Sequence, residues 1–185
     1  MDRFFKIIPP KKLHSPRDNL SYLIPSEAVS HTERILREYG KRIPPHEGLV
    51  YWGGRREGDR ITVSILIAPK TASDYGRVST SPRSNFDVVR LLNKHNRIQV
   101  AQVHSHPGSW VDHSPGDDDW AAFKVNGLLS IVVPGYCRKG MMPVTSCGIH
   151  RYANGEFVRL SPDYVKAHFR IQNSERLIFE DLRHG

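Results

Sequence analysis

Long apolar runs are absent from this chain of 185 residues, and their absence excludes a membrane-spanning helix. Such a helix needs about 20 consecutive apolar residues, whereas the longest apolar runs, 61–69 and 128–134, are far shorter. The first ten residues combine one acidic and two basic side chains with a brief apolar stretch, which is too short for a secretory signal. We therefore expect a cytoplasmic protein.

Cysteine is also scarce, since the chain contains only Cys137 and Cys147. Two cysteines could pair with each other, but they cannot supply the disulfide framework of a small secreted domain. In a cytosolic domain of this size a cysteine is more typically a buried thiol. We expect both thiols to be reduced.

The composition is that of a globular protein, with 38% hydrophobic and 25% charged residues and no internal repeat. The 27 Lys and Arg residues exceed the 19 Asp and Glu residues, which gives a formal net charge of +8. Such a charge suits nucleic acid, an acidic protein or simply a basic surface, so it does not identify a partner. We expect a basic N-terminal segment over residues 1–18 and one domain over residues 19–185.

The hydrophobic pattern alternates between strand and helix signals along the chain. It predicts strands over 20–24, 47–52, 61–68, 98–104, 128–133, 144–152 and 157–160, and helices over 27–39, about 85–97, 115–125 and about 161–182. A capping box of Ser84 and Asp87 is expected to start the second helix, whose buried face is expected to comprise Phe86, Val88, Val89, Leu91 and Leu92. Residues 69–83, rich in Ser and Thr, predict a long irregular surface segment. The fold class is therefore α+β, with a mixed sheet flanked by helices.

The residues that indicate chemistry follow the strand predicted over 98–104. His104 and His106 lie two residues apart, so their side chains point to the same side of the strand. Asp117, at the start of the next predicted helix, can fold back to supply a third ligand. Two imidazoles and one carboxylate leave a coordination position of a bound zinc ion open for water, as in catalytic sites. The spacing predicts one hydrolytic zinc centre per chain.

The arrangement of His104, His106, Ser114 and Asp117 as H-x-H-x7-S-x2-D resembles the motif of the JAMM (MPN-plus) metalloproteases. Members of that family hydrolyse isopeptide or peptide bonds at the C-terminus of ubiquitin-like proteins. The resemblance extends over about residues 20–160 and implies a single JAMM/MPN-like domain with zinc on the two histidines and the aspartate.

The same resemblance implies two further catalytic residues. In the family a glutamate on an earlier strand is the general base, and Glu47 stands at the matching position. We prefer it to Glu38, on the polar side of a helix, and to Glu57, in a charged turn, because the base must reach the metal site. Ser114 is implied to donate a hydrogen bond to the oxyanion, a role compatible with capping the following helix.

Neighbouring residues fit structural roles. We expect Trp110 to pack at the rim of the site and His113 to be a loop histidine without a ligand role. Asp118 and Asp119 fit the electrostatics of a helix N-terminus.

The resemblance implies a zinc-dependent isopeptidase or peptidase whose partners are a ubiquitin-like or sulfur-carrier protein, its conjugates, and associated activating and conjugating enzymes. An extended modifier tail is expected to pair with an exposed strand edge near the histidine strand, with residues 69–83 as a flap. The alternative is a RadC-like, nucleic-acid-associated module of the same fold without protease activity. The chain contains no basic run interleaved with aromatic residues, so nucleic acid is the less favoured partner.

Overall fold

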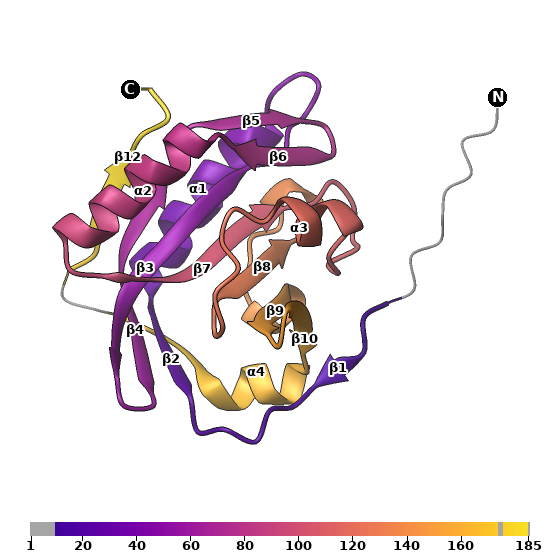
Figure 1. The fold of residues 1–185 in the computed structure, drawn as a ribbon. Helices are drawn as coiled ribbons and strands as arrows, with labels where there is room; N and C mark the ends of the chain where they lie inside the picture. The colour runs from indigo at the N-terminus through magenta and orange to yellow at the C-terminus, as the bar shows by residue number, and fades with distance from the viewer. Residues whose placement is uncertain (1–9, 174–175, 185) are drawn as a thin grey trace.

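A computed structural model describes residues 10–173 and 176–184 of the chain. The elements in chain order are β1 Leu13–His14, β2 Ser21–Pro25, α1 Ser26–Gly40, β3 Leu49–Glu57, β4 Arg60–Ala68, β5 Thr71–Asp74, β6 Arg77–Thr80, α2 Pro82–Lys94, β7 Ile98–Ser105, α3 Pro115–Trp120, β8 Leu129–Val133, β9 Gly148–Ala153, β10 Glu156–Leu160, α4 Pro162–His168, β11 Phe169–Gln172 and β12 Ile178–Asp181. This arrangement, drawn in Figure 1, confirms the α+β class. No helix among the described residues is long and apolar enough to cross a membrane.

The main sheet has the strand order β1-β10-β9-β8-β7-β3-β4-β2-β11, and β12 pairs with β4. Strand β7 is antiparallel to β3 and parallel to β8, so the sheet is mixed. The hairpin β5–β6 forms a separate two-stranded sheet. In Figure 1 this hairpin lies beside α2 at the upper end of the molecule, and α4 lies at the lower end.

Helices cover both faces of β3 because successive side chains of a strand point to opposite faces. Val50 and Trp52 belong to the larger core cluster with the apolar stripe of α1. Leu49 and Tyr51 belong to a second cluster with the buried residues of α2. Leu49 and Tyr51 of β3 therefore point to the face of the sheet that α2 covers. Their partners on β7, His104 and Gln102, point to the same face.

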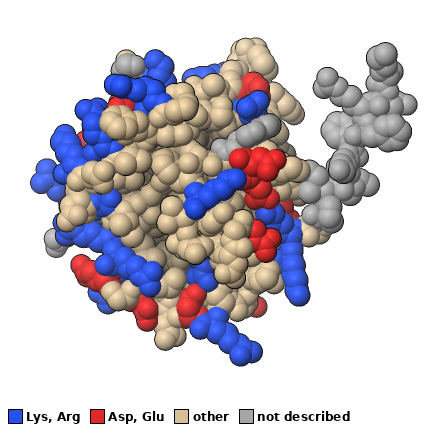
Figure 2. Space-filling model, viewed as in Figure 1, with Lys and Arg blue, Asp and Glu red and all other residues tan. Residues whose placement is uncertain are grey.

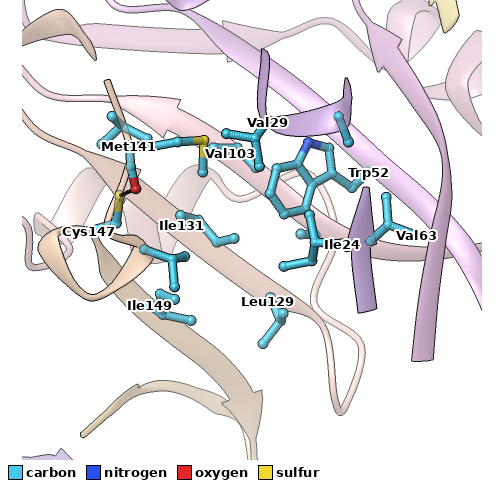
Figure 3. Close-up of a cluster of buried hydrophobic side chains, with 14 of the residues drawn as sticks. Ile24, Val29, Trp52, Val63, Val103, Leu129, Ile131, Met141, Cys147 and Ile149 are labelled. Carbon is cyan, nitrogen blue, oxygen red and sulfur yellow. Dashed lines mark hydrogen bonds between the residues drawn. The ribbon is translucent and has the colours of Figure 1, made fainter. Parts of the chain in front are cut away.

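The larger core is built around fully buried side chains from α1 and the central strands. Figure 3 shows part of this cluster, with Trp52 close to Ile24 and Val29. The indole of Trp52 donates a hydrogen bond to Thr32 Oγ1 at 2.9 Å, and the Thr32 hydroxyl donates to the carbonyl of Ala28 at 2.7 Å. The one polar atom of this aromatic core residue is thereby satisfied.

Both cysteines also lie in this core and are free thiols, as expected. Burial raises the pKa of Cys137 to about 11 and that of Cys147 to about 12. Neither thiol is therefore a nucleophile at neutral pH.

Helix α2 begins earlier than the sequence predicts, since Ser81 is its N-cap and accepts a hydrogen bond from the backbone of Ser84. Its buried face includes Ser84 and Val88, whereas Phe86 is 60% exposed and Val89 is 39% exposed. The predicted buried face was wrong at these two apolar residues. The buried face of α2 begins at Ser84, whose hydroxyl donates a hydrogen bond to the carbonyl of Lys70. The helix is rotated so that Ser84 faces the protein while Phe86 and Val89 face outward.

Residues 69–83 are not irregular, because most of them form the β5–β6 hairpin. Three contacts with distant residues hold it: Tyr39 Oη lies 2.8 Å from Thr71 Oγ1, the backbone N–H of Glu47 donates to the Asp74 carbonyl, and Tyr136 donates to the Tyr75 carbonyl. These partners are remote in the sequence, so local composition could not reveal them.

Both ends of the chain also differ from the prediction. The helix expected over about 161–182 ends at His168, because the following residues join the sheet: β11 pairs with β2 and β12 pairs with β4. Residues 13–14 of the expected N-terminal segment form β1, which pairs with β10. Residues 1–9 of the predicted N-terminal segment lie outside the described residues.

Thr32→Val should destabilise the protein by about 1–3 kcal/mol, because it leaves the buried indole N–H of Trp52 without an acceptor. Urea unfolding measures the change in free energy. Ser30→Ala removes an exposed hydroxyl from the same helix and is the matched control, with an expected change within about 0.5 kcal/mol. Equal losses in the two variants would contradict the role assigned to this bond.

Candidate metal centre

The two motif histidines lie at the end of β7, in the middle of the main sheet. His104 is paired with Leu49 of β3 on one side and with Val132 of β8 on the other. The backbone N–H of His106 donates to the Val133 carbonyl at 2.9 Å, so the chain is held just beyond the strand as well. The two side chains are 3% and 6% exposed. Their positions are therefore set by a strand that is hydrogen-bonded on both edges.

Asp117 reaches the histidines from α3, which begins with the capping box that the sequence predicts. The Asp117 backbone N–H donates to Ser114 Oγ at 3.2 Å. In return, Asp117 Oδ2 accepts from the Ser114 backbone N–H at 2.7 Å and from its hydroxyl at 2.8 Å. Helix α3 ends at Trp120, so it is shorter than the predicted 115–125. The cap orients the carboxylate of Asp117 toward the sheet.

The ligand groups of His104, His106 and Asp117 form a compact triangle, in which the two histidines contact different oxygens of the Asp117 carboxylate. His104 Nε2 lies 3.2 Å from His106 Nε2 and 3.4 Å from Asp117 Oδ1, and His106 Nε2 lies 3.2 Å from Asp117 Oδ2. Metal–ligand bonds of about 2.0–2.1 Å in tetrahedral geometry place neighbouring ligands about 3.3–3.4 Å apart. Within the described residues, this is the only His, Cys, Asp and Glu group that could hold a metal ion. The donor set and its spacing fit a divalent metal.

The hydrogen bonds around the triangle leave suitable lone pairs for a metal. His106 Nδ1 lies 3.1 Å from the Trp110 carbonyl, which can only accept, so Nδ1 carries the proton and Nε2 is free to coordinate. Burial acts to raise the pKa of Asp117, but the adjacent His104 and His106 outweigh it and hold that pKa well below its usual range. The aspartate is therefore ionised.

Glu47 lies two residues before β3, the strand next to β7, and faces the triangle. The Ser105 backbone N–H donates to the Gly48 carbonyl at 3.1 Å and continues the β3–β7 register beyond Leu49, which places Glu47 opposite His106. The local chain has room only for glycine at position 48, where a Cβ would lie 2.9 Å from the Tyr39 ring. Glu47 itself is 4% exposed.

Burial raises the pKa of Glu47 to about 8, and the negative charges of Asp117 and Asp74 add to this rise while His106 opposes it. A carboxyl group with a pKa in this range can take up and release a proton near neutral pH, which a general base must do. A bound cation would lower this pKa through its positive charge.

A narrow groove of about 50 Å³ leads along the sheet to the metal triangle. Its floor includes Leu49, Tyr51 and Gln102, which point to the same face of the sheet as His104. Residues 76–80 of the hairpin form one wall, and Gly116 of α3 with the loop that follows forms the other. The groove therefore opens onto the metal site between the hairpin and α3.

Trp110 and His113 lie between the motif residues in the sequence, and the structure defines the surroundings of both. Trp110 is 37% exposed and stacks on His106 with ring centroids 5.5 Å apart, which agrees with the expected rim position. His113 lies in the loop before α3, as expected, but the sequence does not reveal that it is only 2% exposed and bonded at both ring nitrogens. Its partners, Asp118 and Ser130, lie on different elements, and no spacing in a single sequence reveals such a contact.

The fold and the site together define a mixed α/β domain with a His-His-Asp group that fits a metal ion. The chain is 30% identical over 120 residues to the probable metalloprotease y4jG of Sinorhizobium fredii, an alignment that covers 63% of this chain and 72% of the relative. The chain therefore belongs to the family of this probable metalloprotease. No family model matches the chain.

The fold also resembles the solution structure of protein DSY2949 from Desulfitobacterium hafniense, with a TM-score of 0.62 and 17% sequence identity. The match covers 83% of this chain and 94% of that chain. At this identity the likeness concerns the fold alone.

Glu47→Gln should stabilise the metal-free protein at pH 8 and change it little at pH 5. Between the ordinary pKa of 4.5 and the raised value of about 8, the folded protein retains a proton that the unfolded chain releases, so the stability of the wild type falls as the pH rises. A glutamine side chain does not titrate in this range, so the stability of the variant lacks this dependence on pH. Thermal unfolding with a chelator present measures the effect, and the exposed Glu57→Gln is the control; a difference in Tm that does not grow with pH would contradict it.

Proposed function

We propose that this protein is a JAMM-type zinc isopeptidase or peptidase that hydrolyses the bond at the C-terminus of a ubiquitin-like or sulfur-carrier protein. The observation that carries the proposal is the triangle of ligand groups, with contacts of 3.2–3.4 Å between them, beside a buried glutamate. The motif order along the chain and the metalloprotease relative support it.

Zinc suits the donor set, since two imidazole nitrogens and one carboxylate oxygen are typical ligands of catalytic zinc. His104, His106 and Asp117 would hold it. When bound, zinc polarises a carbonyl and lowers the pKa of a water molecule to about 7. The zinc assignment separates this site from metalloproteins that use oxygen ligands alone.

Glu47 moves the proton in the proposed reaction. Its carboxylate accepts a proton from the attacking water and delivers it to the nitrogen of the departing amine, so water and an amide become a carboxylic acid and an amine. Ser114 holds Asp117 through its hydroxyl. Its proposed bond to the oxyanion requires the same O–H to turn toward the scissile carbonyl, which would stabilise the developing charge.

The hairpin supports a substrate with an extended tail. Both edges of β7 are paired, so a tail cannot add to the histidine strand itself. Strand β6 pairs only with β5 among the described strands, and its other side lines the groove. Main-chain pairing with such an edge binds an extended peptide with little demand on sequence. The tail of a modifier is the substrate that fits this geometry, and its conjugates and conjugating enzymes are the proposed cytoplasmic partners.

The charge distribution on the face shown in Figure 2 gives the RadC-like alternative no specific support. Figure 2 shows Lys and Arg mainly toward the left and lower edges of one face, with Asp and Glu among them. Binding to a nucleic-acid backbone calls for a basic stripe along one path. The peptidase hypothesis is therefore the one we develop.

Glu47→Gln should retain one zinc per chain but lower the turnover of a modifier–lysine conjugate by about 10²–10⁴, because glutamine cannot accept a proton. Metal analysis and cleavage assays on the same sample measure both quantities. Glu57→Gln, at the other end of β3, is the matched control and should cleave like the wild type. Undiminished turnover in Glu47→Gln would remove this residue as the base. Absent cleavage in the wild type with tight, salt-sensitive DNA binding would favour the alternative.

Valine at the two tail positions before the scissile bond should lower kcat/KM by about tenfold or more, because the groove of about 50 Å³ has little room for branched side chains. Kinetics on conjugates with altered tails measure this effect. The same substitution about eight residues upstream lies beyond the four residues of β6 and should have little effect. Equal tolerance of valine at both places would argue against tail binding in this groove.

A further inference from the structure

Helix α3 supplies a metal ligand, Asp117, from a segment with little buried surface at residues 115–119. It is six residues long, and none of residues 115–119 is buried. Short helices in proteins are normally held by an apolar face that packs on the core. Polar contacts of residues 115–119 therefore contribute to the position of Asp117.

Asp118, the residue after the ligand, makes the main contact of this kind. One of its oxygens lies 2.8 Å from His113 Nδ1, and the carboxylate also accepts from Lys11 Nζ at 2.7 Å. A carboxylate only accepts, so Nδ1 of the histidine carries the proton. Successive residues of a helix point about 100° apart. Asp117 therefore faces the metal site while Asp118 faces His113.

His113 is in turn fixed to the sheet on several sides. Its Nε2 lies 2.8 Å from Ser130 Oγ of β8, and that hydroxyl accepts from Gln102 of β7 at 3.0 Å, so it is free to donate to the ring. The imidazole stacks on His150 of β9 at a centroid distance of 4.0 Å and meets the edge of Phe157 of β10 at 4.9 Å. The side chain of His113 is thus packed against the sheet rather than exposed on the loop surface.

We propose that His113 is a positioning residue for the metal centre. Through its bond to Asp118, it holds α3 in the position in which Asp117 completes the triangle with His104 and His106. The inference rests on the metal site of the proposed function and not on its substrate. His113 does not contact the reacting atoms in this role. It acts by restricting the carboxylate ligand to one position, as outer partners of metal ligands commonly do.

The chain offers a matched control for each partner. Asp119 follows Asp118 in the same helix and carries the same charge, but it is exposed. His150 is as buried as His113 and stacks on the same ring, yet neither of its ring nitrogens forms a hydrogen bond, and its Nε2 lies 3.4 Å from Asp112 Oδ1. Loss of charge in α3 and loss of a buried imidazole can therefore be separated from loss of the Asp118–His113 bond.

The test is the affinity of the full chain for Co²⁺, measured by competition with a chelating indicator, together with the visible spectrum of the bound ion. Asp118→Ala and His113→Phe should each weaken Co²⁺ binding by about 10–100-fold and alter the spectrum. The double variant should lose no more than the stronger single variant, because both remove the same bond. Asp119→Ala and His150→Phe should bind Co²⁺ within about twofold of the wild type.

Rescue separates positioning from packing. The side-chain amide of His113→Asn can donate to Asp118 from near the position of Nδ1, so this variant should recover most of the affinity that His113→Phe loses. If His113→Phe fails to fold, Asp118→Ala decides the question, since that side chain is 36% exposed and its loss leaves the core intact. Equal affinities of Asp118→Ala and Asp119→Ala, or no recovery in His113→Asn, would overturn the proposal.

The outcomes also separate this inference from the proposed function. Co²⁺ binding by the wild type without cleavage of any modifier conjugate would refute the peptidase, while the comparison of variants still decides the role of His113. A wild type that binds no Co²⁺ would overturn both.

Discussion

The pairing of β7 on both of its edges is the constraint on which the site depends. Hydrogen bonds to β3 and β8 leave its end no freedom to shift, so His104 and His106 emerge at fixed positions. The same register places Glu47 opposite His106. A slip of one residue would send both histidines to the opposite face, toward α1. The positions of the two histidine ligands and of the candidate base therefore depend on one ladder of backbone hydrogen bonds.

The third ligand is held by a different kind of interaction. Asp117 comes from a helix of one and a half turns, and its support is a capping box and an adjacent acid bonded to a buried histidine. Apolar packing tolerates small displacements, whereas a hydrogen bond weakens steeply with angle and distance. A polar support is thus suited to a ligand that must lie within tenths of an ångström of its place. The sheet supplies rigidity and the helix supplies direction.

Much of this arrangement could be predicted from the sequence, and the failures share a cause. Strand periodicity placed His104 and His106 together, and the Ser-x-x-Asp pattern identified the start of α3. The strands after His168 and the burial of His113 depend on partners more than ten residues away. The hairpin over residues 71–80 is held by Tyr39 and Tyr136, which are more than 30 residues away from the hairpin residues that they contact. Local pattern carries no information about such contacts, and this limit also explains the misplaced face of α2 at Phe86.

Glu47 connects the stability of the protein to its chemistry. The sheet buries a carboxyl group whose pKa rises to about 8, within the electrostatic influence of a second, ionised carboxylate at Asp117. Two acids in a site of low dielectric repel each other, and neither apolar packing nor solvent relieves that repulsion. A divalent cation on the His-His-Asp triangle interacts favourably with both. Because such an ion binds the folded state alone, it stabilises the fold by mass action and leaves Glu47 ready to ionise. The features that make this pocket costly without a metal are therefore those that make it reactive with one.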